Sequence, residues 1–377
     1  MKICAIICEY NPFHNGHLYQ LKQAKQLSGC DKLLCLMSGN FVQRGETAIM
    51  DKYTRAKHAV LAGADIVIEL PTVFATSNAE LFSKGAISIL NQIPNVTTLC
   101  FGCETADKEM FLTTAKQMLN EPPSVSLEIK RLTSKGIGFA KARTTAWGNL
   151  IDTTLLSSPN NVLGLEYTKA ILASHSSIQI LPLKRIGGGY LDEDLKENFS
   201  SATSIRLGLE NKQAIQGQLP SFVLDDLPTT VYNPIDLLEK HAILYKSAEQ
   251  IAKVCDCEKG LENAFKKASL SSKTLAQRLT STRYTTSRIK RIALQNLLNI
   301  EKNLIFQALT SPLYLRILSC KKQDDILSCL GNLPILARIY DEQALNGVAK
   351  EVFEIDQYAE EIYALLYPKQ TNKNIFI

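Results

Sequence analysis

The chain has 377 residues, of which 45% are hydrophobic and 21% charged, a composition typical of soluble globular proteins and a length that suits two domains. No apolar run reaches the length of a membrane span, and the first residues, MKICAIICEYNP, lack the cleavage site of a signal peptide. The ten cysteines form no dense framework, so we expect a cytoplasmic protein with reduced thiols rather than a disulfide-stabilised fold.

The net charge of +5 is distributed unevenly along the chain. Residues 265–321 hold eleven lysines and arginines and a single acid, Glu301, so this segment has a net charge of +10. The other 31 basic and 36 acidic residues give the rest of the chain a net charge of −5. Such an asymmetry indicates a polyanionic partner for the C-terminal half.

The first hundred residues alternate between apolar runs and helical patterns. Continuous apolar runs predict strands that are covered on both faces, and apolar residues three and four apart predict helices between them. The alternation predicts an α/β fold with a doubly wound parallel sheet and right-handed crossovers. The predicted strands are 2–8, 31–39, 65–71 and 96–102, and the predicted helices are 16–28, 51–64 and 77–91.

Beyond residue 105 the pattern is mostly helical. Residues 105–175 form a helical insertion, residues 177–186 predict another strand, followed by GGGY, and SATSIRLGLEN starts a helix at a serine or threonine cap. No strand pattern is visible after about residue 225. We therefore expect a catalytic domain over 1–225 and an all-helical, basic domain over 226–377.

Two of the five histidines, His14 and His17, lie where the first predicted strand turns into the first predicted helix, in CEYNPFHNGHLYQL. Ligands of open parallel sheets bind outside the carboxyl ends of the strands, and a helix start at that place favours phosphate. Gly16 would allow a phosphate to approach the backbone closely. Two imidazoles one turn apart can donate to phosphate oxygens and stabilise the charge that develops in phosphoryl or nucleotidyl transfer.

Histidines three residues apart also occur as surface pairs or as half of a metal site, and the spacing alone favours those interpretations. The position of this pair at a strand-to-helix junction, in an α/β pattern, favours phosphate contact instead. No protein ligand for a metal ion can be named from the sequence.

A second motif, SATSIR over 201–206, also falls at a predicted helix start. The segment NPFHNGH resembles the HxGH signature of the nucleotidyltransferase superfamily, and SATSIR is similar to the second motif of that superfamily, SSTxIR. The resemblance implies a Rossmann-like fold in which Ser201, Thr203 and Arg206 hold the outer phosphates of a nucleotide. Ala202 departs from the pattern, so one hydroxyl group is missing.

Seven segments of the sequence, given at the end of this paragraph, occur together and in the same order as in one family of this superfamily. The combination resembles the tRNA(Met) cytidine acetate ligase family over most of the chain. It implies a reaction in two steps. Acetate first attacks the α-phosphate of ATP, which gives acetyl-adenylate. The acetyl group then passes to the wobble cytidine of elongator tRNA(Met), forming N4-acetylcytidine. Mg²⁺ is expected because ATP carries it. The segments are CEYNPFHNGH, SGNFVQRGE, DKYTRAKHAVLAGADIVIELP, LCFGCE, SPNNVLGLEY, KRIGGGY and SATSIR.

The resemblance also implies which residues act. His14, His17 and Arg206 are the expected catalytic residues. Gly102, at a predicted strand end, suits adenosine packing against the backbone or is an ordinary turn glycine. The first segment expected to bind ATP is Ile7, Cys8, Glu9, Tyr10, Asn11, Pro12, Phe13, His14, Asn15, Gly16, His17, Leu18, Tyr19 and Gln20. The further expected ATP contacts are Gly102, Asn160, Asn161, Arg185, Ile186, Ser201 and Thr203, where the two asparagines could instead only cap a helix.

Polar residues in two other segments are candidates for substrate contact. Asn40, Gln43 and Arg44 in SGNFVQRGE could meet acetate or cytidine, or belong to an ordinary polar loop. Arg55, on the next predicted helix, fits a solvated face. The segment STRYTTSRIKRIALQNLL mixes an aromatic residue with basic residues at helical spacing, which favours RNA binding over a merely solvated helix. The expected RNA-binding residues are Arg283, Tyr284, Arg288, Lys290 and Arg291.

Two other functions remain open from the sequence. A small-metabolite nucleotidyltransferase, which joins ATP or CTP to a phosphate ester, would share the core but would not need the +10 segment. A non-catalytic RNA- or nucleotide-binding protein would not need both histidines and Arg206. The identity of the carboxylate and of the tRNA comes from the resemblance alone.

Overall fold

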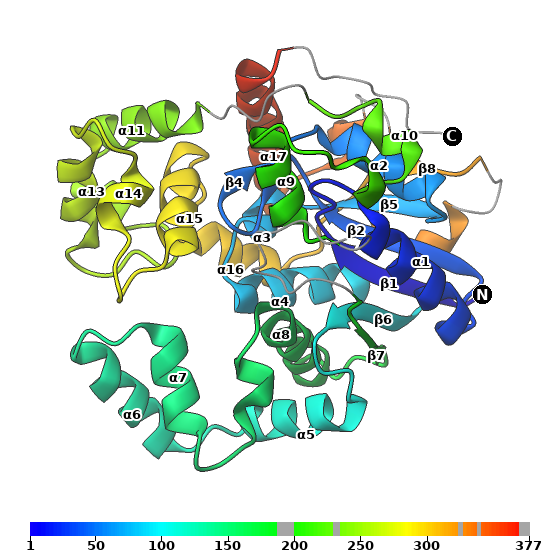
Figure 1. Ribbon diagram of the computed structural model, residues 1–377, viewed down its shortest axis with the longest axis horizontal. Coiled ribbons are helices and arrows are strands. Elements are labelled where there is room, and N and C mark those ends of the chain that lie inside the picture. The colour runs from blue at the N-terminus through cyan, green and yellow to red at the C-terminus, as the bar shows by residue number, and fades with distance from the viewer. Residues whose placement is uncertain (187–199, 229–233, 323–326, 338–340, 369–377) are drawn as a thin grey trace.

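A computed structural model describes residues 1–186, 200–228, 234–322, 327–337 and 341–368 (Figure 1). Its centre is a seven-stranded sheet in the order β7-β6-β1-β2-β5-β8-β9, and β3 and β4 form a separate antiparallel hairpin. The predicted GGGY segment lies outside the described residues. The strands are β1 (Ile3–Cys8), β2 (Lys32–Ser38), β3 (Phe41–Val42), β4 (Glu46–Thr47), β5 (Ile66–Leu70), β6 (Val96–Cys103), β7 (Gln179–Lys184), β8 (Leu315–Cys320) and β9 (Ile335–Leu336).

The sheet is doubly wound, as predicted. Strands β7, β6, β1, β2 and β5 are parallel neighbours, with Ala5 of β1 paired to Leu34 of β2 and to Leu99 of β6. The chain first builds outward from β1 through β2 to β5, and then returns to the other side of β1 to add β6 and β7. The strand order therefore reverses between β1 and β6, which is where such sheets bind ligands.

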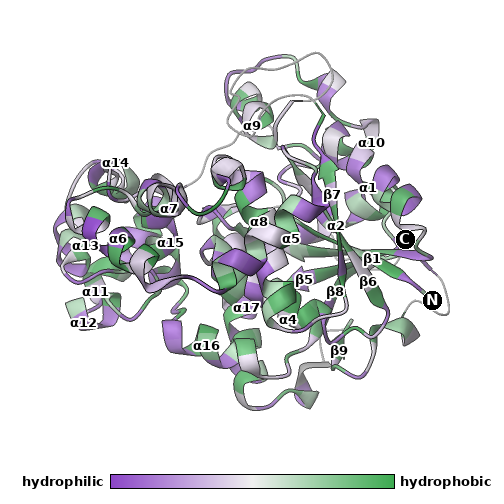
Figure 2. Cartoon of the chain, turned by 90° about the horizontal axis from the view of Figure 1, so that it is seen from below, coloured by the Kyte–Doolittle hydropathy of each residue, from purple (hydrophilic) through white to green (hydrophobic). Residues whose placement is uncertain are grey.

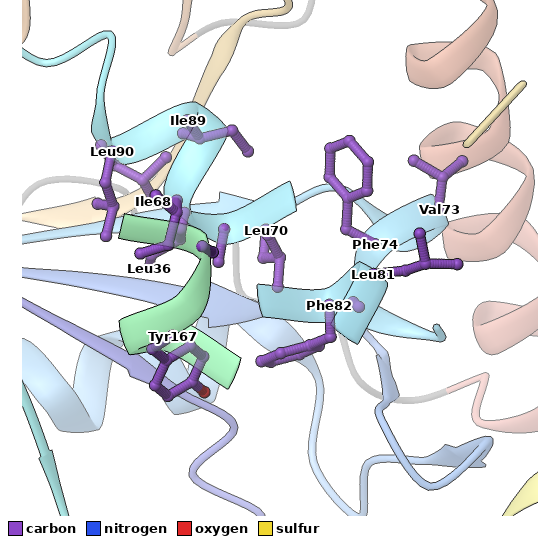
Figure 3. Close-up of a cluster of buried hydrophobic side chains, with 14 of the residues drawn as sticks. Leu36, Ile68, Leu70, Val73, Phe74, Leu81, Phe82, Ile89, Leu90 and Tyr167 are labelled. Atoms are coloured by element: carbon purple, nitrogen blue, oxygen red, sulfur yellow. The ribbon is translucent and has the colours of Figure 1, made fainter. Parts of the chain in front are cut away.

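Both faces of the sheet are buried because successive residues of each strand point to opposite sides. On β1, Ile3 and Ala5 join one apolar cluster, and Cys4 and Ile6 join another. Helices α4 and α8 contribute to the first cluster, part of which Figure 3 shows, and α1 and α2 contribute to the second. The helices of this part are α1 (Asn15–Ser28), α2 (Lys52–Leu61), α3 (Thr72–Ala75), α4 (Ala79–Leu90), α5 (Lys108–Leu119), α6 (Pro123–Ser134), α7 (Phe139–Trp147), α8 (Pro159–Ala173), α9 (Ala202–Glu210) and α10 (Ser221–Leu224).

The C-terminal part is mostly helical, but it also returns to the sheet, so the expectation of no strand beyond residue 225 is wrong. β8 pairs antiparallel with β5, with Ile66 opposite Cys320, and β9 adds to β8. Arg316 obscured this strand in the sequence, because its charge interrupts the apolar run and its ion-pair partners, Glu69 and Glu360, lie far away in the sequence. The helices are α11 (Ile235–Tyr245), α12 (Ala248–Ile251), α13 (Leu261–Ser269), α14 (Leu275–Leu279), α15 (Thr286–Leu297), α16 (Lys302–Thr310) and α17 (Gly347–Leu366).

Helices α11 to α15 have a small apolar core of their own, which includes Ile243, Phe265 and Ile292. By contrast, α16, β8 and α17 share the main core with the N-terminal part, through residues such as Ile305, Ile317 and Val352. In Figure 2 the apolar residues gather along the strands and the inward faces of the helices. The division at residue 225 remains a prediction. Within the described ranges, no helix combines the length and apolarity needed to cross a membrane.

Candidate active site

The candidate site is a pocket at the carboxyl ends of β1 and β6, where the strand order reverses. Its volume is about 170 Å³, and a side pocket of about 40 Å³ adjoins it. The walls come from the β1–α1 loop, the β3–β4 hairpin, α4, α8, the end of β7 and the start of α9. Elements far apart in the sequence therefore converge on the place where open parallel sheets bind ligands.

Most of the residues expected to bind ATP or catalyse its reaction line these two pockets. Pro12, Phe13, Asn15, Leu18 and Asn161 do not. Phe13 is fully buried behind the loop, and Asn15 donates to the carbonyl oxygen of Gly217 at 2.9 Å. The residues that do line them are Ile7, Cys8, Glu9, Tyr10, Asn11, His14, Gly16, His17, Tyr19, Gln20, Gly102, Asn160, Arg185, Ile186, Ser201, Thr203 and Arg206.

His14 and His17 cap the start of α1 with their own side chains. Nδ1 of His14 accepts a hydrogen bond from the backbone N–H of Gly16 at 3.1 Å, and Nδ1 of His17 accepts one from the backbone N–H of His14 at 3.3 Å. This is a reciprocal capping box made of imidazoles in place of the usual Ser/Thr and Glu/Gln pair. The backbone N–H groups of His14 and Gly16 therefore already have hydrogen-bond partners in the imidazole rings. A phosphate in the pocket would contact the rings rather than these two backbone N–H groups.

The capping bonds decide which ring nitrogens can act on a ligand. A nitrogen that accepts a hydrogen bond carries no proton, so the proton of each neutral ring lies on Nε2. The His14 and His17 rings stack with their centroids 3.6 Å apart, and both residues line the pocket. The pair therefore presents two adjacent Nε2–H donors, a pattern suited to the oxygens of a phosphate chain.

Aromatic neighbours and the glycine at position 16 fix the positions of the two histidine rings. The Tyr10 ring lies 4.8 Å from the His17 ring and the Phe13 ring lies 5.6 Å from it, both measured between centroids. A Cβ atom at Gly16 would lie 2.9 Å from Cε1 of His14, closer than real contacts allow. Gly16 is therefore needed so that the His14 ring can fold back over the helix start, a reason that differs from the expected close approach of phosphate.

The environment of the two rings keeps them neutral. Burial lowers the pKa of His14 to about 3, with further lowering by the positive charges of Arg185 and Arg206. Burial also lowers the pKa of His17 well below its usual range, together with His14 and Arg185. Both imidazoles are therefore neutral Nε2–H donors near pH 7, and the positive charge of the site comes from the arginines.

The lowered pKa values predict that acid destabilises the fold. The folded pKa of His14 is about 3 and an unfolded histidine titrates near about 6.5, so below pH ~6.5 the unfolded state binds protons that the folded state does not. The free energy of unfolding should be insensitive to these groups above pH ~7. It should fall between pH ~6.5 and pH ~3, by at most about 1.4 kcal/mol per pH unit for each histidine. Urea unfolding at pH 7 and pH 5 measures this, and a double variant lacking both imidazoles should show a weaker dependence. Equal pH dependence in both proteins would contradict the assignment.

Arg206 links the second motif to the first. Its Nη1 donates to the carbonyl oxygen of Asn11 at 2.7 Å, across 195 residues of sequence, and its Nη2 lies 3.4 Å from Oγ1 of Thr203. Ser201 caps α9 by accepting from the backbone N–H of Ser204 at 3.1 Å. The start of α9 and the β1–α1 loop thereby form two facing walls, and Arg206 supplies positive charge between them.

Arg185 supplies a second positive charge, from the end of β7. Its backbone N–H extends the pairing with β6 by donating to the carbonyl oxygen of Cys103 at 3.0 Å. The guanidinium has no hydrogen-bond or ion-pair partner within the described residues. A Cβ atom at Gly102 would meet Cγ of Arg185 only at 3.4 Å, an ordinary contact. Gly102 thus leaves open pocket space beside Arg185, consistent with a ligand that packs against the backbone.

The two asparagines at the start of α8 have different positions. Asn160 lines the main pocket and its side-chain amide donates to Oε1 of Glu104 at 2.6 Å. Asn161 is buried, and its Oδ1 accepts from the backbone N–H groups of Glu104 and Thr105 at 3.0 and 3.1 Å. Asn160 is therefore placed for ligand contact, and Asn161 shapes the loop after β6.

The β3–β4 hairpin forms the wall opposite the histidines. Glu9 Oε1 accepts from the backbone N–H of Gln43 at 2.8 Å, which ties the hairpin to the end of β1, and burial raises the pKa of Glu9. Gln43, Arg44 and Glu46 line the pocket. Asn40 is instead buried, and its Oδ1 accepts from the backbone N–H of Lys52 at 2.8 Å. Of the three polar candidates in this segment, two reach the pocket.

Sequence reasoning missed the apolar side of the pocket. Phe82 of α4, Phe101 of β6, and Leu163 and Tyr167 of α8 all line it. Their spacing in the sequence is that of ordinary core residues. The sequence alone therefore does not distinguish these pocket residues from the rest of the core. An apolar wall of this kind suits the flat ring of a nucleobase or the methyl group of a small acid.

Arg55 is fully buried, so the expectation of a solvated face is wrong. Its Nε donates to the carbonyl oxygen of Met50 at 2.9 Å, and Nη1 donates to those of Glu9 at 2.5 Å and Ser38 at 3.2 Å. A further bond joins Nη2 to the carbonyl oxygen of Gly39. The chain beyond the ends of β1 and β2 leaves carbonyl groups without sheet partners, and this guanidinium satisfies them beside the candidate site.

Replacing Arg55 by methionine, which has similar length but no donor, should lower the free energy of unfolding by about 3–5 kcal/mol, because buried carbonyl oxygens lose their partners. Urea denaturation followed by circular dichroism measures this. Lys57→Met, at a 41% exposed neighbour on the same helix, is the matched control and should change stability by no more than about 0.5 kcal/mol. A loss below about 1 kcal/mol for Arg55→Met would show that the guanidinium is not needed there.

Comparison with known proteins places the chain in a family. The family model described as HIGH Nucleotidyl Transferase matches residues 1–375. A tRNA(Met) cytidine acetate ligase of Caldanaerobacter subterraneus subsp. tengcongensis is 38% identical to this chain, and the alignment covers 97% of this chain and 96% of the relative. A tRNA(Met) cytidine acetate ligase of Clostridium perfringens is 34% identical, and the alignment covers 98% of this chain and 96% of the relative. The chain belongs to the tRNA(Met) cytidine acetate ligase family of HIGH nucleotidyl transferases.

Solved structures agree with this family assignment. The crystal structure of apo Thermotoga maritima TmcAL superposes with a TM-score of 0.90 at 28% identity, covering all of both chains. A second crystal form of the same protein, bound with alpha-thio ATP, gives a TM-score of 0.88 at 29% identity, again over both whole chains. The similarity extends over the complete ligase fold, including the helical C-terminal region.

Within this ligase fold, three of the residues expected to bind RNA surround one acid. Glu258 accepts hydrogen bonds from Arg283 at 2.5 Å, from Tyr284 at 3.3 Å and from Arg288 at 2.8 Å. Arg288 also donates to the carbonyl oxygen of Asp256 at 2.6 and 3.0 Å, and it is only 17% exposed. Arg288 therefore has a structural role, whereas Arg283 is 45% exposed and can reach a partner.

The other two expected RNA contacts are also paired within the chain. Arg291 is 11% exposed and lies 3.4 Å from Asp256, and Lys290 lies 2.6 Å from Glu46. The second pair joins α15 to the β3–β4 hairpin of the nucleotide pocket. The acids responsible lie more than 30 residues away in the sequence, so this neutralisation could not be predicted from the basic segment itself.

Proposed function

We propose that this chain is an ATP-dependent ligase that activates acetate as acetyl-adenylate and acetylates the wobble cytidine of elongator tRNA(Met) to N4-acetylcytidine. The observation that carries the proposal is the stacked imidazole pair of His14 and His17, flanked by Arg185 and Arg206, at the reversal of strand order. The names of the curated relatives and the ATP analogue bound to the Thermotoga maritima protein support it.

In the first step, an oxygen of acetate attacks the α-phosphorus of ATP, and the bond from that phosphorus to the bridging oxygen of pyrophosphate breaks. Negative charge increases on the leaving pyrophosphate. The imidazole Nε2–H groups and the two arginines are placed to stabilise it, and no protein nucleophile is required. Arg44 on the facing hairpin is suited to hold the carboxylate of acetate.

In the second step, the exocyclic N4 amine of cytidine attacks the acetyl carbonyl carbon, AMP leaves, and the amine nitrogen loses one proton. The apolar wall of Phe82, Leu163 and Tyr167 offers a surface for the bases and the methyl group. Water must be kept from the acetyl-adenylate until the cytidine arrives, and the apolar wall would exclude it from that side of the pocket.

Magnesium fits this pocket only as a partner of ATP. The described residues include no group of three or more His, Cys, Asp or Glu side chains arranged to hold a metal ion. Glu9 and Glu46 are the two carboxylates that line the pocket and would hold such a cation. Mg²⁺ commonly binds through one or two carboxylates together with substrate phosphates, and its charge would further neutralise the triphosphate. We place the reaction in the cytoplasm, in keeping with ten free cysteines.

Isotope exchange between ATP and pyrophosphate, measured with a panel of carboxylic acids and phosphate esters, tests the proposal. Exchange that depends on acetate, followed by transfer of labelled acetate to elongator tRNA(Met), is the expected result. Exchange only with a phosphate ester would identify a small-metabolite nucleotidyltransferase instead. No exchange with any of these compounds would leave a nucleotide-binding protein without the proposed chemistry and would refute the function.

A further inference from the structure

Two segments far apart in the chain carry basic residues without a single acid. Residues 129–151, which span the end of α6 and all of α7, contain five lysines and arginines and no Asp or Glu. Residues 263–300, from α13 to α15, contain eight lysines and arginines and no Asp or Glu. Only the second segment was expected to bind RNA.

The fold brings these two segments into contact. A Cβ atom at Gly138, the N-cap of α7, would lie 2.6 Å from the carbonyl oxygen of Thr282, so the two backbones meet directly. Figures 1 and 2 both place α6 and α7 beside α13, α14 and α15, away from the N-terminus. A cleft of about 860 Å³ runs between them. Five basic residues of the two segments line this cleft, namely Lys130, Arg143, Arg283, Arg288 and Arg291.

The cleft adjoins the nucleotide pocket through two shared helices. On α4, Glu80 lines the cleft and Phe82 lines the pocket. On α8, Glu166 lines the cleft and Tyr167 lines the pocket. A helix is about 10 Å across, so a macromolecule in the cleft would lie roughly that distance from the reacting nucleotide.

The cations inside the cleft differ from those at its edge. Inside, Arg143 is paired with Glu166 at 2.7 Å, and the arginines of α15 are paired as described above. At the edge, Lys135 and Lys141 are exposed and have no side-chain hydrogen bond or ion pair within the described residues. Across the cleft, Arg283 lines the wall and is 45% exposed. Lys135 and Lys141 are therefore available to a partner, and Arg283 can reach one from the other side.

We propose that the helical insertion and the α13–α15 segment form the two edges of one RNA-binding cleft, with Lys135, Lys141 and Arg283 contacting phosphates. The inference rests on the proposed function, in which a tRNA is the acceptor. Exposed lysines and arginines along a cleft are complementary to the phosphate backbone. Phe139 is 55% exposed directly beside Gly138 and offers a stacking surface for an unpaired base.

Charge reversal on the insertion tests the proposal, because the insertion carries none of the originally expected RNA contacts. The variant is Lys135→Glu with Lys141→Glu. The matched control is Lys22→Glu with Lys25→Glu, at exposed positions of α1, with the same change in net charge. Affinity for elongator tRNA(Met) is measured between about 50 and 200 mM salt, together with acetate-dependent ATP–pyrophosphate exchange and melting temperature.

The first variant should bind tRNA at least about tenfold more weakly, with a salt dependence reduced by about two phosphate contacts, and should keep full exchange activity. The control should stay within about twofold of the unmodified chain. A second variant, Arg283→Glu, should also weaken tRNA binding, from the opposite side of the cleft.

Unchanged tRNA affinity in the Lys135→Glu, Lys141→Glu variant, with a normal melting temperature, would overturn the inference and leave the ligase function standing. Equal weakening in the control would also overturn it, since the effect would then follow net charge alone. If the variant lost affinity for polyglutamate and not for tRNA, the surface would be a protein-docking site. Absence of acetate-dependent exchange in the unmodified chain would instead refute the proposed function.

Discussion

Replacing His14 by asparagine and His17 by glutamine should lower acetate-dependent ATP–pyrophosphate exchange by at least about 10³-fold, while the fold remains intact. Asparagine is a good N-cap, and glutamine at the third helical position can return the hydrogen bond of a capping box, so this pair preserves the start of α1. What it removes is the two Nε2–H donors. Loss of one donor to a developing negative charge typically costs about 10²- to 10³-fold in rate.

The alanine pair His14→Ala and His17→Ala is the matched comparison. It should be equally inactive but should also lose about 0.5–2 kcal/mol of stability, because the cap of α1 is removed as well. Thermal melting and urea denaturation separate the two roles. Near-normal exchange in the asparagine and glutamine pair would mean that the imidazoles only cap the helix, and the proposed role in catalysis would be wrong.

Substitution of Arg206 should cause the second largest loss of acetate-dependent ATP–pyrophosphate exchange. Arg206→Met should reduce kcat/KM for ATP in the exchange reaction by about 10²-fold or more, because the positive charge between the two pocket walls is lost. Arg206→Lys keeps the positive charge but lacks the planar guanidinium group that reaches both the Asn11 carbonyl oxygen and the pocket. We therefore expect this variant to lose about tenfold in kcat/KM, an intermediate effect. ATP-dependent initial rates, with melting temperature as a control for the lost bond to Asn11, measure both effects. Full kcat/KM in Arg206→Met would remove this residue from the active site.

Much of the nucleotide-binding half could be predicted because its physical signals are local. Apolar runs such as Ile3–Cys8 indicate a strand buried on both faces, and five residues separate the HNGH segment from that run. Parallel strands place their carboxyl ends on one edge of a sheet, so the position of His14 and His17 followed from the alternation of elements. The ring contacts that fix their protonation needed coordinates, since the capping bonds depend on ring orientation.

What could not be predicted depends on partners far away in the chain. Arg55 looks like a surface residue until the carbonyl groups beyond two strand ends surround it. Arg291 looks like an RNA contact until Asp256 is seen beside it. Arg316 hides strand β8 because its counter-charges come from β5 and α17. In each case a long-range ionic or hydrogen-bonded pairing changes the meaning of a basic residue, and sequence spacing does not report such pairings.

The most direct test of the account is a crystal structure of this chain with a non-hydrolysable ATP analogue. We predict that the triphosphate lies between Nε2 of His14, Nε2 of His17 and the guanidinium groups of Arg185 and Arg206, each within hydrogen-bond distance of a phosphate oxygen. Adenosine should pack beside Gly102. A nucleotide bound at another place, with both imidazoles more than about 5 Å from any phosphate oxygen, would contradict the central claim.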